Sequence, residues 1–109
     1  MKISGKVTKG KGRGKKLGFP TANIELAEKI ESGVYKGFAR VGGKKYKAGI
    51  FIDKNSNSLE AHLVGFSGDL YGKEVEIEIG EKIRDVIKFE SDEELKGQIT
   101  DDLRVIRNL

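Results

Sequence analysis

The 109-residue sequence contains no cysteine, one proline, one histidine and no long run of apolar residues. Without cysteine the chain has neither a disulfide scaffold nor a thiolate metal site, and this composition fits a reducing cytoplasm. No apolar run approaches the roughly 20 residues that cross a bilayer, and the first residues lack the apolar core of a secretory signal. We therefore expect a cytoplasmic protein that forms a single domain over residues 1–109, with one modest hydrophobic core.

Residues 10–23, by contrast, concentrate glycine, basic side chains and the single proline. The segment holds four glycines and four lysines or arginines and ends in Pro-Thr-Ala-Asn. Glycine lets backbone N–H groups approach an anionic ligand, and Pro20 favours an extended chain in which Thr21 and Asn23 point to one side. Their neutral oxygens suit a hard cation such as Mg²⁺ that arrives with nucleotide phosphates. Composition alone also fits a solvated loop or a general contact for polyanions, so both interpretations stay open here.

Charge is unevenly distributed along the chain, although the net charge is only +4. Residues 1–16 contain seven Lys or Arg and no acid, whereas residues 74–94 contain nine Asp or Glu and three basic residues. A basic face attracts phosphate groups, whether they belong to a nucleotide or to a nucleic acid. The charge pattern does not separate these two classes of partner.

Alternating polar and apolar residues indicate several β-strands. In residues 73–79 three aliphatic side chains face one way and three glutamates face the other, which predicts a half-buried strand. Residues 33–41 and 44–52 are separated by Gly42-Gly43, a pair that favours a tight hairpin turn. Residues 59–66 form a further strand candidate.

One amphipathic helix is predicted at the end of the chain. Ser91 and Glu94 form a capping-box pattern, and apolar residues then recur at helical spacing, namely Leu95, Ile99, Leu103 and Ile106. Many short antiparallel strands with one such helix favour a small closed or partly open barrel. We expect the helix to pack on the outside of the barrel or over one end.

Several motifs, taken together, resemble the riboflavin kinase family. In chain order they are Gly10-x-Gly-Arg-Gly-x-x-Leu-Gly-Phe-Pro-Thr-Ala-Asn23, Gly33-Val-Tyr35-x-Gly37, Glu60-x-His62-Leu63, Asp69-Leu-Tyr-Gly72, Arg84-x-x-x-Lys88-Phe89 and the helix from Ser91 to Asp102. The resemblance covers nearly the whole chain, and the order of the motifs makes it specific.

This resemblance implies an all-β domain, a six-stranded Greek-key closed β-barrel with a C-terminal α-helix. It implies a Mg²⁺-dependent enzyme that transfers the γ-phosphate of ATP to the terminal ribityl hydroxyl of riboflavin, giving FMN and ADP. Many bacterial relatives have an adenylyltransferase domain before the kinase, and this chain is too short to hold one, so we expect FMN but not FAD as its product. The expected partners are riboflavin/FMN and ATP/ADP, without nucleic acid or membrane, and the expected form is a monomer.

The functional residues of the family fall on defined positions of this sequence. Catalytic roles are implied for Glu60, as general base for the ribityl hydroxyl, and for Arg84, near the flavin and the reacting phosphate. The resemblance implies that Mg²⁺ is held by Thr21 and Asn23. It also implies ligand-binding roles for Gly10, Gly12, Gly14 and Lys16 over the nucleotide phosphates, for Tyr71 near the adenine and for Phe89 near the flavin.

These side chains also have plain structural interpretations. Without the resemblance, Glu60 is an ordinary strand carboxylate, and Arg84 has acidic residues nearby with which to form a surface ion pair. For Tyr71, packing inside the barrel is the favoured role, and His62, on the same strand face as Glu60, is interpreted as a packing residue. Phosphoryl transfer depends mainly on positioning and charge neutralisation, and a poor hydroxyl nucleophile needs a positioned base. With the resemblance, these requirements favour the functional interpretation of Glu60, and the position of Arg84 in the Arg-x-x-x-Lys-Phe pattern favours a functional role for it as well.

Three departures from the family pattern lie on the flavin side. The region of residues 49–59 is short and lacks proline, Val86 replaces a glutamate of the family motif, and Val64-Gly65-Phe66 replaces Leu-Asp-Phe. Two other functions stay open: a non-catalytic flavin- or nucleotide-binding barrel, and a basic single-strand nucleic-acid binder. The second normally has a row of exposed aromatic residues, whereas the eight aromatic residues here are scattered.

Overall fold

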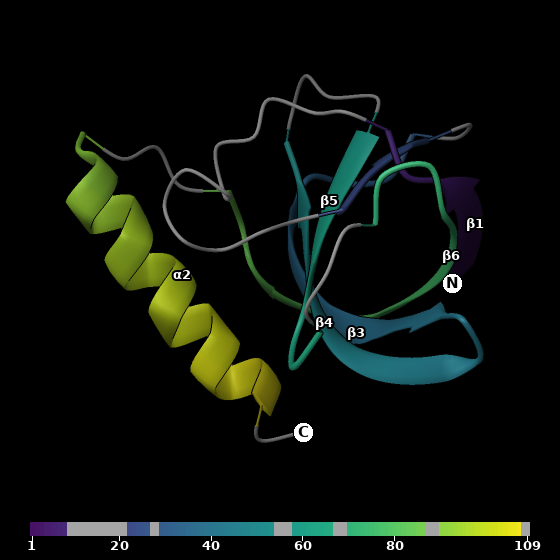
Figure 1. The fold of residues 1–109 in the computed structure, drawn as a ribbon. Coiled ribbons are helices and arrows are strands. Elements are labelled where there is room, and N and C mark those ends of the chain that lie inside the picture. The colour runs from purple at the N-terminus through teal and green to yellow at the C-terminus, as the bar shows by residue number, and fades with distance from the viewer. Residues whose placement is uncertain (9–21, 27–28, 54–57, 67–69, 87–89, 108–109) are drawn as a thin grey trace.

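The computed structural model describes residues 1–8, 22–26, 29–53, 58–66, 70–86 and 90–107. These residues form a β-structure with one helix beside it (Figure 1). The elements are β1 (Lys2–Lys6), β2 (Ala22–Glu25), β3 (Gly33–Val41), β4 (Lys44–Ile52), β5 (Ser58–Leu63), β6 (Glu74–Arg84) and α2 (Asp92–Arg107).

The six described strands form one antiparallel sheet in the order β1-β6-β3-β4-β5-β2. Because β6 returns to lie beside β3 after the β3-β4-β5 meander, the topology is a Greek key. The sheet curls so that its two ends meet where Thr8 forms an isolated bridge with Asn23 of β2. The backbone N–H of Thr8 donates to the carbonyl of Asn23 at 2.7 Å. The predicted all-β, six-stranded Greek-key barrel is confirmed, and it is nearly closed.

The barrel interior is filled by aliphatic side chains that alternate with outward-facing residues along each strand. The largest fully buried side chains in the barrel are Ile24, Ile50, Ile52, Leu59, Ile77 and Val75. Each such side chain contributes about 1.5–3 kcal/mol when it is removed from water. The period of two in the sequence therefore corresponds to burial on the inner face, as predicted.

Strand ends differ from the sequence prediction at two places. The predicted strand 59–66 ends earlier, since β5 spans Ser58–Leu63. The predicted strand 73–79 continues to Arg84, and the register between β3 and β6 shifts twice on the way. These irregularities follow the exposed Gly80 and Glu81, which interrupt the alternation on which the prediction depended. The longer β6 is what brings Arg84 into the sheet.

The predicted hairpin turn is confirmed by the backbone of Gly42 and Gly43, whose φ angles are 58° and 79°. Two consecutive positive φ values are those of a turn that matches the twist of the paired strands β3 and β4. Side chains with a Cβ rarely adopt them, which explains the glycine pair at this position.

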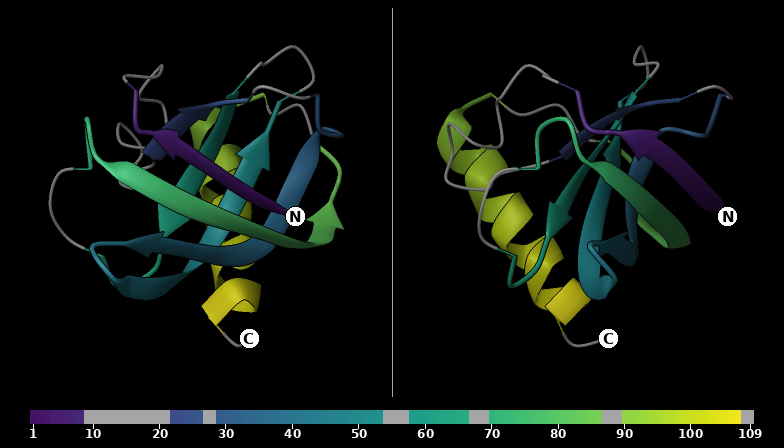
Figure 2. Two further views of the ribbon diagram at one scale, coloured as in Figure 1. Left: turned by 90° about the vertical axis from the view of Figure 1, so that its right-hand side faces the viewer. Right: turned by 45° about the vertical axis from the view of Figure 1, so that its right-hand side comes forward.

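Helix α2 lies along the outside of the barrel, on the side opposite β1 (Figures 1 and 2). Its predicted cap is confirmed, because the backbone N–H of Glu94 donates to Ser91 Oγ at 3.2 Å. The Glu94 carboxylate in turn accepts from the backbone N–H of Glu90 at 3.3 Å, one residue before the expected partner. Ile99, Leu103 and Ile106 are buried against a separate outer cluster to which Phe51, Val64, Ile83 and Leu95 contribute.

Gly49 on the outer face of β4 sets how closely the helix approaches. A Cβ atom at this position would lie 2.8 Å from Cδ1 of Ile106 and 3.6 Å from Cδ2 of Leu103. At the end of the helix, the Lys47 ammonium donates to the carbonyl of Arg107 at 3.0 Å, which satisfies one of the last helical carbonyls. The outside position of the helix is thus fixed by both apolar packing and a polar contact.

Candidate functional site

Asn23 and Glu60, two of the predicted site residues, are direct partners across the β2–β5 pair. Opposed residues of antiparallel strands place their side chains on the same face, and here the two side chains touch. Asn23 Nδ2 donates to Glu60 Oε1 at 3.4 Å, at the long limit of a hydrogen bond. Asn23 is 8% exposed, whereas Glu60 is half-buried. The predicted metal-binding amide and the predicted general base therefore lie side by side.

The direction of Glu60 follows from the alternation along β5. Leu59 and Ala61 are both fully buried in the barrel, so the residues between them face outward. Glu60 and His62 are half-buried on that outer face, which confirms the prediction that they share it. A carboxylate held by two buried neighbours on a strand has a fixed direction, as a general base requires.

Thr8 anchors Asn23 and was not singled out from the sequence. Besides the backbone bond at 2.7 Å, the Thr8 hydroxyl donates to the same Asn23 carbonyl at 3.3 Å. Thr8 lies 15 residues before Asn23, within a segment whose basic side chains dominated the sequence analysis. No local pattern signals a pairing across that distance, since it arises only when the barrel closes.

The orientation of the Asn23 amide follows from the chemistry of its partner. An ionised carboxylate only accepts hydrogen bonds, so the amide nitrogen must face Glu60, and the amide oxygen Oδ1 faces the other way. A neutral amide oxygen can be a ligand of Mg²⁺. Because it carries no charge, it does not neutralise the ion, whose positive charge can then be balanced by phosphate oxygens. The residues that the structure describes contain no cluster of three or more His, Cys, Asp or Glu that could hold a metal. The donor set thus fits an ion that arrives with a phosphate ligand.

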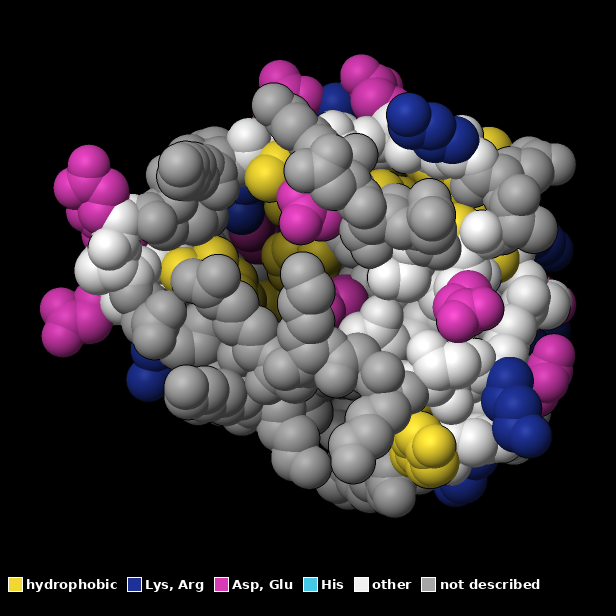
Figure 3. All heavy atoms as spheres, turned by 90° about the horizontal axis from the view of Figure 1, so that it is seen from above, with side chains coloured by type: hydrophobic (Ala, Val, Ile, Leu, Met, Phe, Trp, Pro, Cys, Tyr) yellow, Lys and Arg dark blue, Asp and Glu magenta, His cyan; other side chains and the backbone are white. Residues whose placement is uncertain are grey.

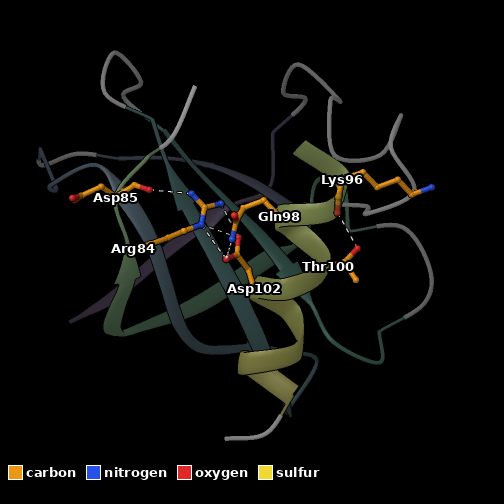
Figure 4. Close-up of polar contacts among 6 residues, drawn as sticks. All are labelled: Arg84, Asp85, Lys96, Gln98, Thr100 and Asp102. Carbon is orange, nitrogen blue, oxygen red and sulfur yellow. Dashed lines mark hydrogen bonds and ion pairs between the residues drawn. The ribbon is translucent and has the colours of Figure 1, made fainter. Parts of the chain in front are cut away.

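Arg84, the second predicted catalytic residue, lies at the end of β6 and contacts helix α2 (Figure 4). Its Nε donates to Asp102 Oδ1 at 3.0 Å and Nη2 donates to Asp102 Oδ2 at 2.8 Å, which makes a forked ion pair. Gln98 Nε2 donates to the same carboxylate at 3.2 Å, and Arg84 Nη1 donates to the Asp85 carbonyl at 3.0 Å. Asp102 is 2% exposed. The expected acidic partner of Arg84 exists, but it is a buried residue of the helix.

Asp102 is a residue whose importance was missed in the sequence. The missed signal is an acid on the apolar side of an amphipathic helix, three residues after Ile99 and four before Ile106. Buried acids in such positions need a charged or hydrogen-bonding partner. The spacing along the helix indicates that Asp102 is buried. Its partner Arg84 was not identified, because it lies at the end of β6, beyond the predicted strand of residues 73–79.

The two polar pairs are connected by one transverse row of the sheet. Cross-strand partners run from Asn23 to Glu60, from Glu60 to Phe51, from Phe51 to Val34 and from Val34 to Arg84. Glu60 and Arg84 are three strand spacings apart along this row, or roughly 14 Å measured along the sheet. Phe51 packs against α2, and Val34 is 2% exposed. The row thus has polar residues at its two ends and apolar residues between them.

A second ion cluster adjoins the Arg84 end of this row. Lys82 Nζ lies 2.6 Å from Asp85 Oδ1 and 3.3 Å from Glu31 Oε1. The hydrogen bond to Asp85, followed by that to Glu31, raises the pKa of Lys82 above its ordinary value of 10.5, against the opposing effect of burial. Both carboxylates are strongly exposed, so this cluster differs from the buried Arg84–Asp102 pair.

Tyr71 contradicts one part of the sequence analysis. It was expected to fill the barrel, but it is 62% exposed, in the turn before β6. The turn around Gly72, with a φ of 79°, carries the ring away from the core. The prediction of a packing role is therefore wrong, and the prediction of a contact with adenine stays a prediction.

The other predicted ligand-binding residues lie outside the described residues. They are Gly10, Gly12, Gly14, Lys16, Thr21 and Phe89. Seen from above, the side of the molecule where α2 lies has a hollow in which hydrophobic, acidic and basic side chains gather (Figure 3). Across the described ranges, no helix combines the length and the apolar character needed to cross a membrane.

Comparisons with known proteins agree with this architecture. The family model described as "Flavokinase: Riboflavin kinase" matches residues 1–109. A bifunctional riboflavin kinase/FMN adenylyltransferase from Buchnera aphidicola subsp. Schizaphis graminum is 36% identical, over 96% of this chain and 37% of the relative. The same kind of protein from Escherichia coli K12 is also 36% identical, over 92% of this chain and 35% of the relative. This chain therefore spans little more than a third of the length of these relatives.

One solved structure gives the same result. The crystal structure of riboflavin kinase from Trypanosoma brucei is similar with a TM-score of 0.73 and 27% identity, over 98% of this chain and 77% of the other. With the match of the family model over the whole chain, the prediction from the sequence motifs is confirmed: this chain belongs to the riboflavin kinase family.

Proposed function

We propose that the protein transfers the γ-phosphate of ATP to the terminal ribityl hydroxyl of riboflavin and releases FMN and ADP. The observation that carries this proposal is the Asn23–Glu60 pair, within a chain that the riboflavin kinase model matches from residue 1 to residue 109. The pair puts a neutral oxygen ligand beside an outward-facing carboxylate. Metal-assisted phosphoryl transfer to a hydroxyl needs that combination.

Glu60 is proposed as the general base. Its carboxylate accepts the proton of the ribityl hydroxyl while the hydroxyl oxygen forms a bond to the γ-phosphorus and the bond between that phosphorus and the bridging oxygen of ADP breaks. The hydrogen bond from Asn23 at 3.4 Å is long, so it directs the Glu60 carboxylate without strongly competing for the proton. The outward direction of Glu60, between the buried Leu59 and Ala61, keeps the base available to a substrate.

Asn23 is proposed to hold Mg²⁺ through Oδ1, together with Thr21. Mg²⁺, when bound, would neutralise charge on the transferring phosphate and orient the nucleotide. Thr8 supports this role, because its two hydrogen bonds to the Asn23 carbonyl fix the backbone from which the amide projects. ATP is proposed as the phosphate donor on the basis of the family.

The remaining predicted residues are proposed as ligand contacts. Gly10, Gly12, Gly14 and Lys16 would bind the nucleotide phosphates, Phe89 would lie near the flavin, and the exposed ring of Tyr71 would contact the adenine. Arg84 is proposed to act near the flavin and the reacting phosphate. We also propose that the protein is a monomer and acts without nucleic acid or membrane. We propose the cytoplasm as its compartment, because a sequence without cysteine fits a reducing environment.

The test is to incubate the protein with riboflavin and Mg²⁺ and with ATP, GTP or CTP in turn, and to measure FMN. We expect FMN with ATP and no FMN when Mg²⁺ is removed with a chelator. No FMN with any donor would contradict the proposed activity and favour a non-catalytic barrel.

We propose that residues 1–109 stop at FMN. The relatives are named as having an adenylyltransferase activity as well, and this chain covers 35–37% of their length. Prolonged incubation with excess ATP should therefore give FMN without FAD. FAD formed by the purified chain would overturn this part of the proposal.

A further inference from the structure

The transverse row of cross-strand partners Asn23, Glu60, Phe51, Val34 and Arg84 is called the Glu60 row. The forked ion pair between Arg84 and Asp102 joins one end of this row to helix α2 (Figure 4). We propose that Asp102 is a positioning residue for the kinase reaction, because it holds the guanidinium of Arg84 in the orientation in which Arg84 acts. The proposal rests on the proposed function. It assigns a role in the reaction to a helix that contributes none of the predicted catalytic residues.

The geometry of the pair fixes the guanidinium rather than merely neutralising it. Two nitrogens of Arg84 bind two different oxygens of Asp102, at 3.0 and 2.8 Å, and a third nitrogen binds the Asp85 carbonyl at 3.0 Å. A planar group that donates from all three of its nitrogens, to partners on two of its edges, has one orientation. The carboxylate is fixed in turn, because Gln98 donates to Oδ1 at 3.2 Å from the preceding turn of the helix.

Burial shows that this arrangement is not a surface ion pair. Asp102 has a side-chain exposure of 2% and Arg84 of 16%. Removing two charges from water is unfavourable, and well-packed apolar residues often stabilise a fold at least as well as a buried ion pair. Core stability alone therefore does not account for a forked ion pair at this position, whereas the need to orient a long arginine side chain does.

Apolar packing also holds the helix that carries Asp102. Because Gly49 has no side chain, Cδ1 of Ile106 lies 2.8 Å from the position that a Cβ atom of residue 49 would take. Leu103 packs at the same place and is 2% exposed. Phe51, which is the cross-strand partner of Glu60, packs against this helical cluster. The helix therefore touches the Glu60 row at two points, at Phe51 by apolar packing and at Arg84 by the ion pair.

A double-mutant cycle tests the proposal. FMN formation is measured for the wild type, Asp102→Asn, Arg84→Gln and the double variant, well below the thermal transition of each, with the folded fraction checked by circular dichroism. We expect Arg84→Gln to lower kcat about 100-fold, the size of effect seen when a positioned electrostatic group is lost. Asp102→Asn should lower kcat about 10-fold, with a small change in KM, as for loss of a group that orients another. The double variant should match Arg84→Gln within about twofold.

Asp101→Asn is the matched control, because it changes the same residue type one position away. Asp101 lies 3.8 Å from Arg104 in a pair whose side chains are 67% and 73% exposed, and this substitution should leave kcat unchanged. If Asp102→Asn does not fold, Asp102→Glu replaces it in both backgrounds. Effects of Asp102 and Arg84 that multiply, or a wild-type kcat for Asp102→Asn, would overturn the positioning role. A wild-type protein that forms no FMN would instead overturn the proposed function and the inference with it.

Discussion

The two polar pairs at the ends of the Glu60 row differ in almost every physical respect. Asn23 and Glu60 share one hydrogen bond of 3.4 Å, and the carboxylate is half-buried. Arg84 and Asp102 share a forked ion pair with contacts of 2.8–3.0 Å, and Asp102 is 2% exposed. The Glu60 carboxylate thus accepts one long hydrogen bond from its partner, whereas both oxygens of the Asp102 carboxylate accept hydrogen bonds from Arg84.

This difference matches the two roles proposed for the pairs, reaction for Glu60 and orientation for Asp102. A general base must bind a proton during the reaction, so strong permanent hydrogen bonds to its charged form would work against it. A positioning acid has the opposite requirement, because it acts only while it stays ionised and bound. The contrast therefore supports the proposals that Glu60 takes part in the chemistry and that Asp102 orients Arg84.

The largest effect is expected for Glu60→Gln. The substitution keeps the size and the outward direction of the side chain but removes its ability to accept the hydroxyl proton. Loss of a positioned general base lowers the rate about 10²- to 10⁴-fold. Stopped assays of FMN formation measure this loss, while thermal unfolding should show little change because the residue is half-buried on the outer face.

Glu76→Gln is the control for this change, since Glu76 is also a half-buried strand carboxylate, on the regularly alternating part of β6. It should leave the rate unchanged. A Glu60→Gln variant with nearly wild-type kcat would show that Glu60 is only a strand carboxylate and would remove the contrast between the two pairs.

The next effect, on stability, is expected for Arg84→Gln. It leaves the Asp102 carboxylate buried without its cation, which is expected to lower the free energy of unfolding by about 3–5 kcal/mol. Urea unfolding followed by circular dichroism measures the loss. Arg104→Gln, on the exposed side of the same helix, should change stability by less than about 1 kcal/mol.

An apolar replacement of the whole pair sharpens this prediction. The double variant Arg84→Met with Asp102→Leu removes both charges, so much of the lost stability should return. Its rate of FMN formation should stay low, because the guanidinium is absent. Recovery of both stability and rate would mean that the pair serves packing alone.

A smaller effect is expected for Asn23→Ala. Loss of the amide oxygen should raise the Mg²⁺ concentration needed for half-maximal rate by at least about tenfold, the lower end of what metal sites lose with an orienting partner. The measurement is the rate as a function of Mg²⁺ at saturating riboflavin. Riboflavin binding without nucleotide, followed by flavin fluorescence, should hardly change. Equal loss of that binding would mean that Asn23 supports the flavin pocket instead.

Local sequence patterns predicted the barrel because its strands alternate regularly. The alternation of Val75, Ile77 and Ile79 with polar residues predicts that they are buried, and the pair Gly42-Gly43 predicts the turn. Glu60 was found through a motif, and its direction followed from its buried neighbours. These features depend on residues close together in the chain, so the sequence carries them directly.

Features that depend on distant pairing were not predictable in the same way. Asp102 pairs with Arg84 across 18 residues, and Thr8 meets Asn23 across 15. β6 was expected to end at Ile79 because Gly80 and Glu81 break the alternation, although its pairing with β3 resumes beyond them. Tyr71 shows the opposite error, since an aromatic residue was assigned to the core while the turn at Gly72 directs it outward. Long-range pairing, rather than residue type, decides the first three cases, and a local turn decides the last.

The smallest effect concerns the exposed ion cluster beside the buried pair. Asp85 links the two, because its carboxylate binds Lys82 at 2.6 Å and its carbonyl accepts from Arg84 at 3.0 Å. The pKa of Lys82 is raised in the folded protein, so its contribution to stability is present below its ordinary value of 10.5 and is lost as pH rises through the folded value. Lys82→Gln should therefore lie below the wild type in stability from neutral pH to about pH 10, and the two should converge at higher pH.

Urea unfolding at several alkaline pH values, at low and high salt, measures this convergence. High salt should shrink the difference at every pH, since exposed charges are screened. Lys44→Gln is the control, because Lys44 is exposed and forms no ion pair with any of the described residues, so its curve should run nearly parallel to the wild type. A Lys82→Gln difference that persists unchanged above the lysine range would show that the side chain acts through packing rather than charge.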